Sequence, residues 1–198
     1  QHYCSKLAMN IEGLGEKIVE QLIENKLVKN IDDLYSIKKN EISKLDGLGE
    51  KSAENIIDSI DNSKETTFSK FVYALGIRNV GEHTSKLLER KFKGDIDRFK
   101  NATETELLEI DEIGEIVARS IVSFWKNEKN SIIVKNCLNR GVIINRMMQS
   151  LSNQLSDNVF VFTGALSMMS RKDAKTLVEG SGGQTKNSIT KKTTYLVA

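Results

Sequence analysis

Ile11-Glu-Gly-Leu-Gly15 is the first of four copies of one short phrase, and this repetition decides the fold. The other copies are Leu45-Asp-Gly-Leu-Gly49, Ile77-Arg-Asn-Val-Gly81 and Ile110-Asp-Glu-Ile-Gly114. Their final glycines are 34, 32 and 33 residues apart, and each glycine is followed by a glutamate. A period in this range indicates a supersecondary unit that occurs several times in one fold.

The four phrases belong to two longer repeats. When residues 30–60 are shifted by 65 positions they fall in register on residues 95–125, so that Asp32 meets Asp97 and Gly49 meets Gly114. The first and third phrases are related by a shift of 66. The sequence therefore predicts a duplicated block of about 65 residues, each copy holding two phrases and a connector.

The spacing of apolar residues in both blocks is helical. After each final glycine, small or apolar residues recur at the three- and four-residue intervals of an amphipathic helix. Proline, which breaks helices, is absent from the chain. We expect short connector helices at 30–36 and 95–100, a capped helix starting near Thr103, and a closing helix over 128–140 that Gly141 ends.

The last part of the chain has a different pattern. Val159-Phe-Val-Phe-Thr163 reads as a strand ended by Gly164, and Ser170 can cap a helix that runs to about Gly180. Two short strands are expected at 184–186 and 194–197. The fold class predicted is mainly α: a tandem helix-hairpin-helix domain over 1–141, a linker over 142–157, and an α/β module over 158–198 that looks truncated.

Composition limits the classes of function. The chain has 198 residues, a net charge of +2, 39% hydrophobic and 28% charged residues, so we expect a soluble, cytoplasmic protein without a membrane segment. The charge is uneven, at −1 over residues 1–156 and +3 from Asp157 onward, so nucleic-acid contacts would depend on local placement. Cys4 and Cys137 are expected to be reduced, buried thiols. We find no acid–base pair, activated nucleophile or metal cluster, and expect no catalysis by this segment alone.

An apolar-x-Gly-apolar-Gly phrase between two helices describes a helix-hairpin-helix element. Glycine permits a tight turn and lets another backbone approach closely, because it carries no Cβ. The helix that follows begins with unpaired N–H groups at the positive end of its dipole, which suits a phosphate. Contacts of this kind hold the nucleic-acid backbone without reading base sequence.

The predicted DNA-binding residues follow from this reasoning, although the copies are unequal. Asn79 replaces the first glycine of the third phrase and tolerates a positive φ, whereas Glu112 in the fourth would repel a phosphate. We therefore expect the fourth copy to contribute mainly to packing. The predicted set is Gly13, Leu14, Gly15, Lys17, Gly47, Leu48, Gly49, Lys51, Arg78, Asn79, Val80, Gly81, His83 and Gly114. The alternative interpretation is a set of sharp turns in a helical bundle, with ordinary solvated charges.

Several stretches resemble bacterial NAD-dependent DNA ligases. The opening His2-Tyr-Cys-Ser-Lys-Leu-Ala-Met-Asn-Ile-Glu-Gly-Leu-Gly15 is similar to that family's junction between its zinc finger and its hairpin domain. Ala74-Leu-Gly-Ile-Arg-Asn-Val-Gly81 is similar to its third hairpin. The tail, with Phe162-Thr-Gly-Ala-Leu166, Gly182-Gly183 and Lys192-Thr-Thr-Tyr-Leu-Val197, resembles the first half of a BRCT module.

This resemblance implies a function for the whole enzyme and a part of it for this chain. The implied enzyme uses NAD to adenylate a lysine, passes AMP to the 5′-phosphate of a nick and closes the break, with magnesium and a structural zinc bound. The resemblance implies that this chain holds duplex DNA at the nick beside the upstream ligase domains. The adenylation lysine and the zinc cysteines would lie outside the chain, Cys4 would not be a ligand, and no cofactor is expected within it.

Two other functions remain open from the sequence. The chain could be an interaction scaffold whose tail recruits a partner, or the DNA-binding end of a different repair enzyme. BRCT modules can hold a phosphopeptide through a Ser or Thr and a Gly after the first strand, the place of Thr163 and Gly164. The partner lysine of that pocket would fall beyond Ala198, so phosphopeptide binding is not expected.

Overall fold

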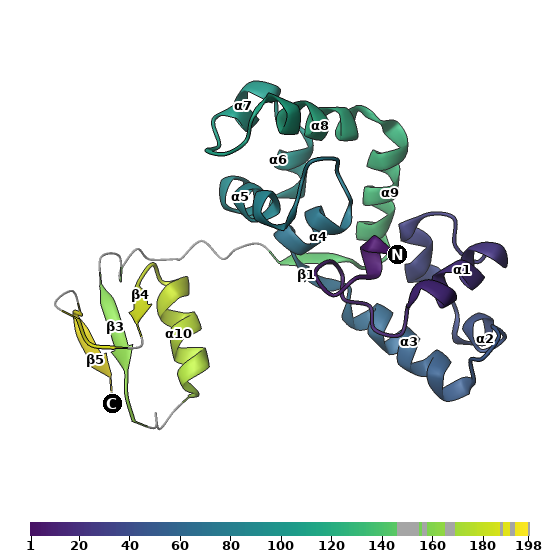
Figure 1. Ribbon diagram of the computed structural model, residues 1–198, viewed down its shortest axis with the longest axis horizontal. Coiled ribbons are helices and arrows are strands. Elements are labelled where there is room, and N and C mark those ends of the chain that lie inside the picture. The colour runs from purple at the N-terminus through teal and green to yellow at the C-terminus, as the bar shows by residue number, and fades with distance from the viewer. Residues whose placement is uncertain (146–154, 156–157, 165–168, 187, 191–192, 198) are drawn as a thin grey trace. The chain divides into compact units, whose positions relative to one another are not determined.

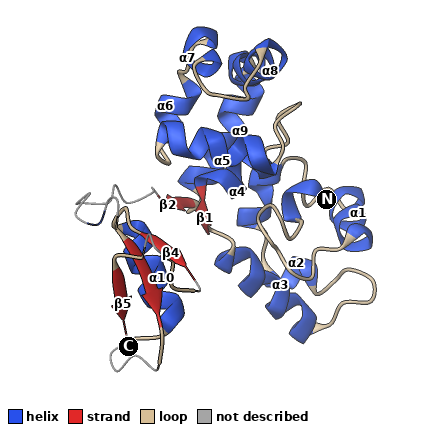
Figure 2. Ribbon diagram, turned by 60° about the vertical axis from the view of Figure 1, so that its left-hand side comes forward, coloured by secondary structure: helices blue, strands red, loops and turns tan. Residues whose placement is uncertain are grey.

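The computed structural model describes residues 1–145, 155, 158–164, 169–186, 188–190 and 193–197. The chain forms two compact units, Gln1–Arg146 and Met147–Ala198. The regular structure of the first unit is mostly helical, with one short strand pair, and the second contains a small sheet, as the ribbons coloured by secondary structure show (Figure 2). The mainly α fold class is therefore confirmed. None of the helices formed by the described residues is long and apolar enough to cross a membrane.

The two predicted blocks are present in the first unit, and the elements of the first correspond in order to the first five of the second, with α9 as an additional closing helix (Figure 1). The elements of the first block are η1 (His2–Cys4), α1 (Glu16–Glu24), η2 (Ile31–Ser36), α2 (Lys39–Ile42) and α3 (Glu50–Asn62), where η marks a 3₁₀-helix. Those of the second are α4 (Phe68–Ala74), α5 (Glu82–Phe92), α6 (Ile96–Lys100), α7 (Glu104–Leu108), α8 (Glu115–Lys126) and α9 (Glu128–Asn139). The connectors η2 and α6 occupy equivalent places, as predicted.

Side-chain caps begin two of the short helices, and the sequence predicts the one at Thr103 but not the one at Asp95. Asp95 accepts a hydrogen bond from the backbone N–H of Arg98 at the start of α6, and Thr103 accepts one from that of Glu106 at the start of α7. Each bond satisfies one of the amides that a helix leaves unpaired at its first turn. The predicted cap of α7 is therefore confirmed.

An aromatic cluster fills the core of the second block. The ring of Phe99 lies 5.4 Å from that of Phe68, 5.2 Å from that of Phe92 and 5.6 Å from that of Trp125, centroid to centroid. Tilted and edge-to-face pairs at these distances add to the stabilisation that burial provides. In the first block Leu22, Ala53 and Ile56 are buried at the corresponding helix faces.

The first unit ends later than the predicted boundary at residue 141. Gly141 ends α9 with φ +102, but Val142 is buried and Ile143–Asn145 forms strand β2. This strand pairs in parallel with β1 (Glu65–Thr67), which lies between the two blocks. Residues 142–145 of the predicted linker therefore belong to the helical unit, because a β-ladder and a buried valine hold them there. The rest of that linker lies mostly outside the described residues.

The second unit has the predicted strand, helix, strand, strand order. Strands β3 (Val159–Phe162), β4 (Gln184–Lys186) and β5 (Tyr195–Val197) form a parallel sheet in the order β4-β3-β5. Helix α10 (Arg171–Gly180) packs against it through Ala174 and Val178, and its cap is Ser170. Because Tyr195 and Leu196 are about half exposed, at 50% and 53%, this small sheet is only partly covered.

Candidate nucleic-acid interface

The third residue of each phrase, which is glycine in the first two copies, has a left-handed backbone conformation. We call the phrases hairpins 1 to 4 (residues 11–15, 45–49, 77–81 and 110–114). The backbone φ at their third residue is +85 at Gly13, +78 at Gly47, +63 at Asn79 and +69 at Glu112. Glycine adopts this conformation freely and asparagine tolerates it, whereas other residues are strained there. The predicted tolerance of Asn79 is confirmed, and Glu112 is the strained member of the series.

The fifth residue of each phrase is glycine in all four copies, and its backbone is extended rather than left-handed. Gly15, Gly49, Gly81 and Gly114 have φ values of −71, −101, −90 and −91, which any residue can adopt. A Cβ built on any of these four would find no atom of the described residues within 4 Å. Neither backbone strain nor internal packing therefore requires glycine at this position. The open space where each Cβ would stand faces away from the described protein atoms.

Each of these glycines is the N-cap of the long helix that follows it. The Gly49 carbonyl accepts the N–H of Ala53 at 2.9 Å, and the carbonyls of Gly15, Gly81 and Gly114 each accept the equivalent bond, four residues on, at 2.9–3.0 Å. No side chain caps α1, α3, α5 or α8 at these positions. The first amides of these helices have no intrahelical acceptor, and they mark the positive ends of the helix dipoles. An anion that approaches the bare glycine can accept hydrogen bonds from them.

The apolar residue between the two glycine positions holds each hairpin in the core. Leu14, Val80 and Ile113 are buried, and Leu48 is partly buried against the same core. This matches the expected packing role. The side chains of Leu14 and Val80 point into the protein, so a DNA contact at these positions could involve only their backbone. Their membership of the DNA-binding set stays a prediction.

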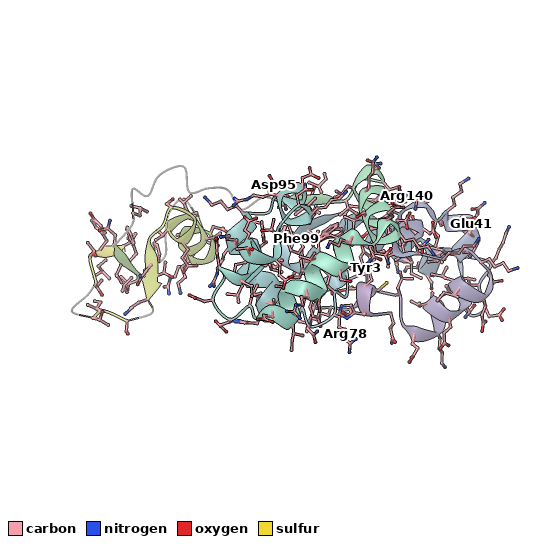
Figure 3. All side chains as sticks on the ribbon, turned by 90° about the horizontal axis from the view of Figure 1, so that it is seen from above. Tyr3, Glu41, Arg78, Asp95, Phe99 and Arg140 are labelled. Atoms are coloured by element: carbon pink, nitrogen blue, oxygen red, sulfur yellow. The ribbon has the colours of Figure 1, made fainter. Side chains whose placement is uncertain are left out.

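The predicted cations differ between the hairpins. Lys17, Lys51 and Arg78 are exposed, and among the described residues no carboxylate lies within ion-pair distance of them. Figure 3 shows Arg78 projecting outward, at the edge of the ribbon opposite Arg140. His83 is also exposed, but its Nε2 lies 3.0 Å from the Glu112 carboxylate of hairpin 4.

Hydrogen bonds join the hairpins in two pairs. In the first block, Gln21 of α1 bonds both backbone groups of Asp46 in hairpin 2, at 2.8 and 3.2 Å. The backbone N–H of Glu12 in hairpin 1 donates to the hydroxyl of Ser59 in α3 at 2.6 Å. In the second block, the side-chain amide of Asn79 donates a hydrogen bond to the hydroxyl of Ser120 in α8 at 3.2 Å. Each hairpin is thus fixed against the other half of its pair.

A buried polar cluster fixes the first connector to the closing helix. The Asp32 carboxylate is 3% exposed and accepts bonds from Arg140 at 2.9 Å and from Asn136 at 3.0 Å, both on α9. The same guanidinium lies 3.4 Å from Asp33. This cluster ties the first block to the second. The sequence did not reveal this cluster. Asp32 and Asp97 occupy equivalent positions in the two repeats, yet only Asp32 is buried, and the repeat pattern gives no sign of that difference.

The cysteines lie beside buried tyrosines and have the properties expected of structural thiols. Cys4 and Cys137 are both free and buried. The hydroxyls of Tyr3 and Tyr35 share a hydrogen bond of 2.7 Å. Burial raises the pKa of Cys137 and that of Tyr35 to about 12, and raises the pKa of Tyr3 and of Cys4 as well. Among the described residues there is no cluster of three His, Cys, Asp or Glu side chains that could hold a metal ion.

Two backbone groups at the phosphopeptide position of the second unit make internal hydrogen bonds, and these do not involve the Thr163 hydroxyl, so the expectation about phosphopeptides stays a prediction. The Thr163 backbone N–H donates to the carbonyl of Val197 at 2.8 Å, which extends the pairing of β3 with β5. The carbonyl of Gly164 accepts from the Arg171 guanidinium at 2.7 Å, and Gly164 has φ +67.

Family comparisons agree with this geometry. Residues 5–62 match the model "SAM-like Helix-hairpin-helix tandem" and residues 70–134 match "Helix-hairpin-helix motif". Residues 150–198 match "BRCA1 C Terminus (BRCT) domain". The two helix-hairpin-helix matches coincide with the two blocks.

Curated relatives extend the similarity beyond the separate motifs. DNA ligases from Geobacter sulfurreducens and Geobacter metallireducens are each 45% identical to this chain over 197 residues, and a DNA ligase from Syntrophus aciditrophicus is 43% identical over 198. The chain matches DNA ligases along its whole length. It spans 29% of the length of these relatives, so it corresponds to one segment of a DNA ligase.

Proposed function

We propose that this chain is the DNA-binding segment of an NAD-dependent DNA ligase and that it holds duplex DNA at a nick. The helix-hairpin-helix motifs would bind phosphates of both strands through the first amides of α1, α3 and α5. Lys17, Lys51 and Arg78 would add charge beside these amides. Because phosphate contacts carry no base information, binding would not depend on sequence.

The observation that carries this proposal is that four equivalent helices each begin at a glycine N-cap with no side chain over the first amides. Nothing inside the protein requires glycine at Gly15, Gly49, Gly81 or Gly114, since their φ values are ordinary and the place of the missing Cβ is empty. Close approach of a molecule from outside explains the glycines at the starts of α1, α3 and α5, whereas Gly114 has the same open space but stands two residues from the carboxylate of Glu112. A phosphate backbone has the charge that the helix starts attract.

The chemistry of ligation is assigned to parts of the enzyme outside this chain. We propose that those parts use NAD and magnesium, carry the adenylation lysine and the structural zinc, and work in the cytoplasm. The described residues do not supply a metal-binding set, and Cys4 is buried with a raised pKa. The role proposed for this segment is therefore to bind and position the substrate without a catalytic step of its own.

The hairpin contacts can be tested with two matched variants. We expect Gly49→Val to weaken binding to nicked duplex at least tenfold, because its side chain would stand between the amides of α3 and the phosphate. Gly114→Val introduces the same side chain at the same kind of N-cap, so it shares the cost in helix stability, about 1 kcal/mol. It should change affinity less, because Glu112 already disfavours a phosphate at hairpin 4.

Binding should be measured by fluorescence anisotropy across a salt series, with circular dichroism as a check on folding. Phosphate-driven affinity falls as salt rises because counterions are released. Normal binding by Gly49→Val would show that the hairpin amides do not hold phosphate. Negligible binding by the unaltered chain at low salt, together with a stable protein partner, would instead favour an interaction scaffold.

A further inference from the structure

A small hollow lined by three lysines lies beside hairpin 3. Its volume is about 220 Å³, and its lining includes Lys6, Lys70 and Lys86, together with Thr67, Ser69 and Glu82. These residues come from the turn after η1, the start of α4 and the first two turns of α5. One water molecule has a share of about 30 Å³ in the liquid, so the hollow is large enough for a phosphate group.

The charges around this hollow are unbalanced. The Glu82 carboxylate is held by Lys86, with the ammonium 2.6 Å from the oxygen, and this hydrogen bond and charge lower the pKa of Glu82. Within the part of the chain that the structure describes, Lys6 and Lys70 have no carboxylate at ion-pair distance. Two ammonium groups thus remain uncompensated at one hollow, in a stretch of chain whose net charge is −1 over residues 1–156. An anion in the hollow would relieve their repulsion.

The hollow adjoins a proposed DNA contact. Glu82 lines the hollow and directly follows Gly81, the N-cap glycine of hairpin 3. Phosphates of one strand follow each other at about 3.4 Å along the axis of duplex DNA. A strand held at Gly81 would carry further phosphates on either side of the one bound there.

We propose that Lys6, Lys70 and Lys86 form a phosphate-binding site that holds the DNA strand next to the phosphate bound by hairpin 3. This inference rests on the proposed function and extends its footprint beyond the motifs. The site is not part of the repeated pattern. A shift of 66 residues relates Lys86 to Glu20 in the first block, which has the opposite charge. A phosphate held there by Lys6 of the first block and by Lys70 and Lys86 of the second would add to the contacts of hairpins 1 to 3.

A charge-matched comparison tests this site. The double variant Lys6→Gln/Lys70→Gln removes the two uncompensated cations and leaves the Lys86–Glu82 pair intact. The control Lys126→Gln/Lys129→Gln changes the net charge equally, at exposed lysines that do not line the hollow. Affinity for nicked duplex should be measured for both variants and for the unaltered chain over a range of salt concentrations, with thermal melting to confirm folding.

We expect the first variant to bind more weakly and to reduce the slope of log affinity against log salt by about one, since the hollow would hold one phosphate and each neutralised phosphate contributes close to one. The control should keep the slope of the unaltered chain. An unchanged slope in Lys6→Gln/Lys70→Gln, or an equal decrease in both variants, would overturn the lysine site. If Gly49→Val still weakens binding in that case, the proposed function stands without this site; if the unaltered chain itself does not bind, both fail.

Discussion

At the scale of single residues, the third and fifth positions of each hairpin are subject to different physical constraints. The third is set by backbone conformation, with φ between +63 and +85 in all four copies. The fifth is conformationally ordinary and has empty space where a side chain would be. A substitution at the third position should therefore act mainly on folding, and one at the fifth mainly on the approach of a ligand.

Glu112 offers a residue-scale prediction. Its positive φ costs a non-glycine residue about 1–2 kcal/mol, while its contact with His83 is between side chains that are 65% and 68% exposed and so contributes little. We expect Glu112→Gly to stabilise the unit by about 1 kcal/mol in thermal melting. It should also strengthen DNA binding, because a carboxylate leaves the hairpin tip and His83 is released.

The variant Glu112→Asn separates these two effects. It removes the charge but keeps a residue that tolerates the left-handed bend, so affinity should rise with a smaller gain in melting temperature. If neither variant changes DNA affinity, hairpin 4 lies away from the bound DNA. If Glu112→Gly lowers the melting temperature, the strain assigned to residue 112 is wrong.

At the scale of elements, the arrangement of the two blocks depends on contacts outside the repeated phrase. The parallel pair β1–β2 joins the segment between the blocks to the chain after α9. The Asp32–Arg140 pair joins η2 to α9. Both contacts link residues more than seventy positions apart, and together they fix the first hairpin pair relative to the second.

The Arg140 contact yields an element-scale prediction. Arg140→Met leaves the Asp32 carboxylate buried without its cation, so we expect the free energy of unfolding to fall by about 2–4 kcal/mol; the value is discounted because the Arg140 side chain is 32% exposed. Asp32→Asn/Arg140→Met should recover part of this loss. The quantity to measure is the midpoint of urea unfolding.

Arg119→Met is the matched control for that experiment. Arg119 also pairs with two carboxylates, Glu104 and Glu115, but its side chain is 66% exposed. Its removal should change stability by less than about 1 kcal/mol. Equal losses in Arg119→Met and Arg140→Met would mean that burial of the Asp32 pair does not matter.

The sequence predicted local structure better than long-range contacts. The spacing of the phrases predicted the duplicated blocks, and the capping residues Thr103 and Ser170 predicted where α7 and α10 begin. Strand β2 was not predicted, because three residues after a glycine carry little signal until β1 is brought beside them. The lysine hollow could not be predicted either, since Lys6, Lys70 and Lys86 meet only in the folded chain.

At the scale of the whole molecule, the chain combines a helical unit suited to phosphate with a small BRCT-type sheet. The net charge of +2 is too low for nonspecific polycation binding, so affinity for DNA must arise from placed amides and a few placed cations. The helix-hairpin-helix unit provides these at α1, α3 and α5, while hairpin 4 presents Glu112 and the exposed Ile116 instead.

The most direct test of this account is a backbone amide NMR titration of the chain with a nicked duplex. The account predicts the largest shifts at the first two residues of three helices: Glu16 and Lys17 of α1, Glu50 and Lys51 of α3, and Glu82 and His83 of α5. The amides of Glu115 and Ile116 serve as the internal comparison and should shift less. Binding that leaves the three helix starts unshifted while signals move elsewhere would contradict the claim that the hairpin amides hold DNA phosphates.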